Sequence, residues 1–114
     1  MRISLHSPIF DGKEIQFANS CIKSSWLSSS GKFVKLFEDK VKSFTKSKFA
    51  IACVNGTAAL QISLRLAGVK NNHEVIVPTI TFIAPVNAVK YNGANPIFMD
   101  CDEYCNIDVK KTIE

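Results

Sequence analysis

Apolar residues recur three or four positions apart in two segments of the first 46 residues, and this spacing marks one face of an α-helix. The first segment begins after Asp11, a predicted N-cap. The second spans residues 31–46 and carries a mostly aromatic stripe. Residues 1–10 are expected to form an extended arm, and the Ser-rich residues 26–31 a loop. The two stripes consist of Ile15, Ala18 and Ile22, and of Phe33, Phe37, Val41 and Phe44.

Residues 49–100 show a different pattern, in which short continuous apolar runs alternate with stretches of helix-forming residues. Continuous apolar runs are typical of strands that are buried on both faces of a sheet. Alternating strands and helices indicate right-handed βαβ units, so the sequence predicts an α/β fold with three layers, α/β/α, and a mainly parallel sheet. The predicted strands are residues 49–54, 74–77 and 96–100, and the predicted helices are residues 58–67 and 82–91.

Polar segments follow the carboxyl ends of the predicted strands, at residues 55–57, 79–82 and 100–102. Ligands of parallel sheets bind at this edge, so we expect a binding site there. Thr81 is expected to cap the helix of residues 82–91, and Asp108 to cap one further helix that begins directly after it.

The turn Asn55-Gly56-Thr57 joins a predicted strand to a predicted helix. The first N–H groups of a helix lack an intrahelical acceptor, and together with the helix dipole they favour an anion, most often phosphate. Gly56 allows close approach of the backbone to a ligand, and Thr57 adds a hydroxyl donor. Taken alone, however, these residues are better interpreted as an ordinary turn with Thr57 as the N-cap.

Length, charge and cysteine content narrow the class of protein. The 114 residues suffice for at most one domain, and 46% apolar residues suit a globular chain. The absence of a long apolar run or a signal peptide predicts a cytoplasmic protein with no membrane partner. The net charge of +4 comes largely from lysines that we expect on a solvated helix face, not against nucleic acid. The four cysteines form no Cys-x-x-Cys pair, so we expect reduced thiols and no metal site.

Several short motifs occur in a distinctive order along the chain. They are Trp26-Leu-Ser-Ser-Ser-Gly31, Phe37-Glu38, Asn55-Gly-Thr-Ala-Ala-Leu60, Glu74-Val-Ile-Val-Pro78-Thr-Ile-Thr-Phe82, Asn87-Ala88, Gly93-Ala94 and Phe98-Met-Asp100. Their order and spacing resemble those of the DegT/StrS family of sugar aminotransferases, which use pyridoxal 5′-phosphate (PLP). The resemblance covers nearly all of the chain but only the N-terminal part of a family member.

The resemblance implies the large domain of a fold-type I PLP-dependent transferase. Residues 1–30 would be the N-terminal arm, helix and Ser-rich loop, and residues 31–114 the first part of the PLP-binding large domain. On this basis the chain is expected to be a truncated portion of the enzyme. The family's Schiff-base lysine would lie beyond it, so the chain is expected to contain no catalytic residue and to be inactive alone.

The resemblance also implies site residues. Gly56, Thr57 and Ala58 would hold the cofactor phosphate, and Phe82 would stack on the pyridine ring. On the pattern of residues alone, Phe82 is better interpreted as a core-facing residue at the start of a helix. Substrate contacts would come from Trp26, Ser28 and Asn87, whereas Asp100 would lie near a strand end and only hold a loop in place.

The function implied is transfer of an amino group, from glutamate, to a keto-sugar nucleotide for surface polysaccharides, by a homodimer. Residues 74–108 are most similar to members that act on 4-keto-6-deoxy amino-sugar nucleotides. The alternative is a small non-catalytic α/β domain that binds a phosphorylated ligand. The chain lacks both the Gly-x-Gly-x-x-Gly fingerprint and the acidic cluster usual in such domains.

Overall fold

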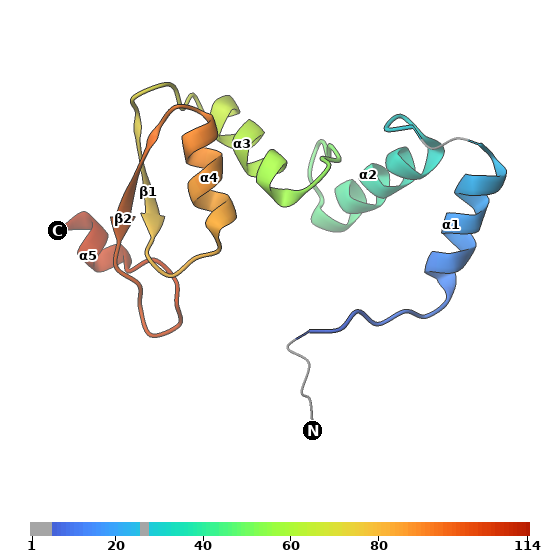
Figure 1. Ribbon diagram of the computed structural model, residues 1–114, viewed down its shortest axis with the longest axis horizontal. Helices are drawn as coiled ribbons and strands as arrows, with labels where there is room; N and C mark the ends of the chain where they lie inside the picture. The colour runs from blue at the N-terminus through green and yellow to red at the C-terminus, as the bar shows by residue number, and fades with distance from the viewer. Residues whose placement is uncertain (1–5, 26–27) are drawn as a thin grey trace. The chain divides into compact units, whose positions relative to one another are not determined.

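The computed structural model describes residues 6–25 and 28–114. The chain divides into two compact units, Met1–Ala52 and Cys53–Glu114, whose elements are labelled in Figure 1. In the part of the chain that is described, no helix is long and apolar enough to cross a lipid bilayer.

The first unit contains the two predicted helices, α1 (Lys13–Lys23) and α2 (Lys32–Thr45). The rings of Phe17 and Phe33 meet edge to face, with centroids 5.5 Å apart. The prediction of Asp11 as an N-cap is wrong by one residue. Gly12 occupies that position at φ 92°, a left-handed conformation that glycine adopts without steric cost. Asp11 Oδ1 instead accepts the N–H of Lys13 at 3.0 Å.

The predicted strand at residues 49–54 is not formed. A strand is stable only when its backbone groups pair with a neighbour, and the described strands pair with each other instead. The apolar run therefore lies outside the described sheet and is largely exposed, with Ile51 83% and Val54 88% accessible. Its Ala52 N–H donates to Glu38 Oε1 at 2.9 Å, which joins the segment to α2.

The second unit is a βαβ unit with one helix before it and one after it. Its elements are α3 (Gly56–Leu66), β1 (Glu74–Pro78), α4 (Ile83–Tyr91), β2 (Asn95–Met99) and α5 (Val109–Ile113). The two strands run parallel, with Ile76 opposite Ile97 and Val77 opposite Phe98. This arrangement confirms the predicted α/β class and its parallel sheet.

A small apolar core joins α4 to the sheet. Val77 of β1, Val89 of α4 and Ala94 before β2 are 5% exposed or less, and Ala88 is fully buried. Partly buried side chains surround this cluster, namely Leu64, Val69, Val75 and Val86. The core thus fixes α4, and with it the loop before α4, relative to the carboxyl ends of the strands.

The caps of the two later helices differ in how well they were predicted. Asp108 caps α5 as expected, since its side chain accepts the N–H groups of Lys110 and Lys111. Thr81 does not cap α4. Phe82 occupies the N-cap position without a side-chain hydrogen bond, because the chain stays extended for one more residue, at φ −67° and ψ 153°.

Candidate cofactor site at the carboxyl edge

The N-terminus of α3 presents free backbone donors. Asn55 is its N-cap, and the Asn55 Oδ1 accepts the N–H of Ala58 at 2.9 Å. The N–H of Ala59 donates to the Asn55 carbonyl oxygen at 3.1 Å. Within the described residues, no acceptor contacts the N–H groups of Gly56 and Thr57. Two adjacent donors at the positive end of the helix dipole are therefore available to an anion.

The surroundings of Gly56 leave room for such an anion. Gly56 is exposed, and a Cβ added there would meet no atom within 4 Å. Thr57 is half-buried beside it and contributes a hydroxyl group. The interpretation of Thr57 as the N-cap is wrong, because Asn55 occupies that position. Of the residues predicted to hold a phosphate, Gly56 and Thr57 have free amides, whereas the amide of Ala58 is already bound by Asn55.

Phe82 lies at the start of α4, in the short loop that follows β1. Its side chain is 79% exposed, so the interpretation of Phe82 as a core-facing residue is wrong. An exposed ring at this edge is free to pack on a planar ligand. Asn87 lies one turn further along α4 and is half-buried. Its side-chain amide has no hydrogen-bond partner in the described part of the chain, so it is available to a ligand.

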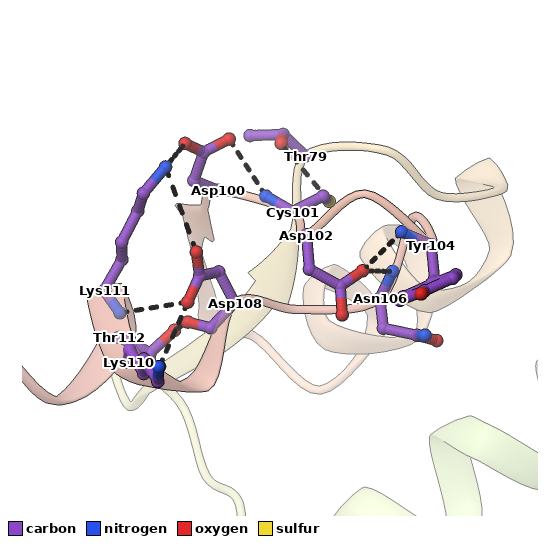
Figure 2. Close-up of polar contacts among 10 residues, drawn as sticks. All are labelled: Thr79, Asp100, Cys101, Asp102, Tyr104, Asn106, Asp108, Lys110, Lys111 and Thr112. Atoms are coloured by element: carbon purple, nitrogen blue, oxygen red, sulfur yellow. Dashed lines mark hydrogen bonds and ion pairs between the residues drawn. The ribbon is translucent and has the colours of Figure 1, made fainter.

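Asp100 directly follows β2 and is engaged in holding the next loop (Figure 2). Its Oδ2 accepts Lys111 Nζ at 2.6 Å, and its Oδ1 accepts the N–H of Cys101 at 2.9 Å. The hydrogen bond from Lys111 is the main cause that lowers the pKa of Asp100, and the same bond raises the pKa of Lys111. Lys111 Nζ also lies 3.9 Å from Asp108 Oδ2. These contacts agree with the predicted role of Asp100 in holding a loop.

The other two residues predicted to contact the substrate, Trp26 and Ser28, do not belong to the second unit. Trp26 lies outside the described residues. Ser28 is exposed, and its Oγ lies 3.3 Å from Ser30 Oγ. Ser28 lines a cavity of about 600 Å³ together with Ser20, Cys21, Ser24, Ser30, Gly31, Lys32, Phe33 and Val34. Four of the residues that line this hollow are serines, so its wall is rich in hydroxyl groups.

Two further residues at the edge were not predicted. The sequence pattern predicts Thr57 as the cap of α3 and not Asn55, although an asparagine three residues before a helical N–H is a standard cap signal. Cys101 is predicted only as a reduced thiol, and the structure adds that its Sγ contacts the loop after β1. The four cysteines are free, and the described residues contain no group of three or more potential metal ligands. Sequence spacing carries no signal for Cys101, because its partners lie more than 20 positions away.

The sequence is similar to that of known sugar-modifying enzymes and matches one family model. The sequence model of the DegT/DnrJ/EryC1/StrS aminotransferase family matches residues 8–114. GDP-perosamine synthase of Escherichia coli O157:H7 is 44% identical over 100 residues, which are 88% of this chain and 28% of that protein. GDP-perosamine synthase of Caulobacter vibrioides is 41% identical over 111 residues, 96% of this chain and 30% of that protein. The chain thus spans less than a third of the length of these relatives.

A solved structure shows the same fold. Spr1654 of Streptococcus pneumoniae, assigned as a sugar aminotransferase and solved in its PLP form, superposes with a TM-score of 0.88 at 26% identity. The match covers 98% of this chain and 29% of the other. The same protein is also solved in a PMP form, with the same TM-score. The resemblance inferred from the motifs and the fold type inferred from it are therefore confirmed.

Proposed function

Because the chain belongs to the DegT/DnrJ/EryC1/StrS aminotransferase family, we propose that it is the cofactor-binding N-terminal part of a PLP-dependent sugar aminotransferase. The proposed reaction moves an amino group from glutamate to a keto-sugar nucleotide for surface polysaccharides. The observation that carries the proposal is the exposed N-terminus of α3, where the amides of Gly56 and Thr57 have no acceptor within the described residues. The GDP-linked product named in the relatives supports a sugar nucleotide as substrate.

The free amides and the exposed ring of the second unit suit the two ends of PLP, a phosphate and a flat ring. The cofactor phosphate would accept hydrogen bonds from the N–H groups of Gly56 and Thr57 and from the Thr57 hydroxyl group. The exposed ring of Phe82 would pack on the flat pyridine ring and hold it in one orientation. Asn87 would offer its unpaired amide to the cofactor or the substrate. When bound, PLP supplies an electron-accepting ring and a carbonyl carbon that reacts with amines.

The proposal also assigns some parts of the site to residues outside this chain. The lysine that binds the cofactor covalently would come from the remainder of the protein, so residues 1–114 alone would not transfer an amino group. Trp26 and Ser28 would contact the sugar nucleotide, and a second subunit would complete the site in a cytoplasmic homodimer that needs neither nucleic acid nor membrane. The existence of both a PLP and a PMP form of Spr1654 supports an amino group carried by the cofactor.

The proposal is tested with the complete product of the gene that encodes residues 1–114. The protein is incubated with PLP, glutamate labelled with an isotope of nitrogen and a panel of keto-sugar nucleotides. The masses of the products are then measured by mass spectrometry. We expect labelled nitrogen in the sugar of at least one nucleotide, and none when PLP is removed or when residues 1–114 are used alone. A protein that binds phosphate esters but labels no sugar would contradict the proposal and favour the non-catalytic α/β domain.

A further inference from the structure

The loop that presents Phe82 is attached to the end of β2 by a cysteine. The N–H of Thr79 donates to the Met99 carbonyl oxygen at 2.9 Å, which extends the ladder between the strands by one residue. Beyond that point, Cys101 Sγ accepts the N–H of Ile80 at 3.3 Å. The same Sγ lies 3.6 Å from Thr79 Oγ1 (Figure 2). In the described part of the chain, no other side chain makes a hydrogen bond to residues 79–82.

The backbone on either side of Cys101 is itself held in place. The Cys101 N–H donates to Asp100 Oδ1 at 2.9 Å, and Cys101 pairs with Ile107 in an isolated antiparallel bridge. Between these two residues, Asp102 Oδ1 accepts two backbone N–H groups, each at 2.9 Å. The sulfur therefore belongs to a closed loop whose position is fixed by β2. Its contacts with residues 79 and 80 hold that segment in place relative to β2.

We propose that Cys101 is a positioning residue for the cofactor ring, because its thiol orders the loop from which Phe82 extends. The inference rests on the proposed function, which assigns Phe82 to the ring of PLP. A loop that is ordered before the cofactor arrives loses less conformational freedom on binding, and this raises affinity without any new contact to the ligand. Cys101 itself touches neither the proposed phosphate donors nor Phe82 through any hydrogen bond within the described residues.

The first arm of the test measures the loop without the cofactor. Hydrogen–deuterium exchange of the peptide covering residues 79–82 is compared between wild type and Cys101→Ala in the complete gene product. We expect exchange at least about threefold faster in the variant, since the Ile80 N–H loses its acceptor. Cys105→Ala is the matched control, because Cys105 is an exposed free cysteine of the same loop. Equal exchange in wild type and Cys101→Ala would overturn the inference.

The second arm measures PLP affinity in a double-mutant cycle. Cys101→Ala is expected to raise the Kd for PLP about three- to fivefold, and to have no further effect in a Phe82→Leu background. Cys101→Val and Cys101→Ser repeat the comparison, the first without an acceptor and the second with one, so Ser should restore part of the affinity. An unchanged Kd, or effects that simply add, would show that the contact does not act through Phe82 and would overturn the inference.

The two arms also separate this inference from the proposal on which it rests. A wild-type protein that does not bind PLP would overturn the proposed function, and the inference with it. Faster exchange in Cys101→Ala together with normal wild-type PLP binding and an unchanged variant Kd would overturn the inference alone.

Discussion

Replacing Asn55 with alanine or with aspartate separates the stability of α3 from its affinity for a phosphate group. Asn55 Oδ1 caps the helix by accepting the Ala58 N–H at 2.9 Å. Loss of an Asn cap costs about 1 kcal/mol, so Asn55→Ala should lower the unfolding temperature. Asn55→Asp keeps the acceptor and adds a negative charge at the positive end of the dipole, a gain of about 0.3–1 kcal/mol. We therefore expect Asn55→Asp to be at least as stable as wild type.

The two variants should rank differently in their affinity for PLP than in their stability. A carboxylate at this cap would lie about 5 Å from a phosphate held by the neighbouring amides. At an effective dielectric constant of about 60–80, a charge of about −2 is then repelled by about 2 kcal/mol. This energy corresponds to a Kd about thirtyfold higher. Asn55→Ala introduces no charge, so it should weaken PLP binding much less than Asn55→Asp does.

The assay is titration of the apo protein with PLP, followed by the absorbance of the bound cofactor, with thermal unfolding of each variant alongside. Raising the ionic strength from about 0.05 to 0.5 M should reduce the difference between Asn55→Asp and wild type, because salt screens the repulsion. If Asn55→Asp binds PLP as tightly as wild type while remaining folded, no phosphate lies at the N-terminus of α3 and the reasoning is wrong.

Three further substitutions test the fold of the second unit. Gly93→Ala should destabilise it by about 1–2 kcal/mol in thermal unfolding, because φ is +73° and the new Cβ would lie 2.5 Å from Asn71 Oδ1. Val89→Ala should cost about 2 kcal/mol, since Val89 is 1% exposed and its truncation leaves a cavity. Lys111→Gln should lower stability slightly at pH 7, and this effect should shrink as the pH falls below 3.8. The pKa of Asp100 is lowered, so its paired carboxylate stabilises the fold above its ordinary pKa of 3.8 and loses that effect as it becomes protonated.

Controls for these substitutions come from the same chain. Val54→Ala should change unfolding by less than about 0.5 kcal/mol, because Val54 is 88% exposed. In 0.5 M salt the effect of Lys111→Gln should shrink, since the ion pair with Asp100 is exposed. A Gly93→Ala protein as stable as wild type, a Val89→Ala effect no larger than that of Val54→Ala, or a Lys111→Gln effect that does not shrink as the pH falls below 3.8 would each contradict the corresponding structural argument.

The elements that rest on local pattern could be predicted from the sequence. The aromatic stripe of residues 33–44 predicts α2. The continuous apolar runs of residues 74–77 and 96–100 predict the two parallel strands. The turn proposed to bind phosphate was also recognisable as a helix start, because a strand-like run, a glycine and a helix follow one another there. Each of these signals lies within a few consecutive residues, where spacing and propensity act directly on the backbone.

The features that could not be predicted depend on residues distant in sequence or on single-residue choices of conformation. The run of residues 49–54 has the composition of a strand, but strand formation also needs a partner, which composition does not reveal. The caps at Gly12 and Phe82 differ from the predicted ones by one residue each, since helix ends are set by local backbone angles. The contact of Cys101 with Ile80 depends on the pairing of β1 with β2.

The central claim is that backbone amides at the start of α3 bind the phosphate of PLP. The most direct test compares Gly56→Pro with Gly56→Ala in the complete gene product. Proline is favoured at the first helical position and follows an extended residue such as Asn55, so it removes the N–H while keeping the helix. Alanine adds a Cβ but retains the N–H, and so controls for added bulk.

The quantity to measure is the ratio of the Kd for pyridoxal, which lacks the phosphate, to the Kd for PLP. We predict a large ratio for wild type and Gly56→Ala and a ratio about tenfold or more smaller for Gly56→Pro, as expected for the loss of a charge-assisted hydrogen bond. Equal ratios in all three folded proteins would contradict the assignment of the phosphate to this helix.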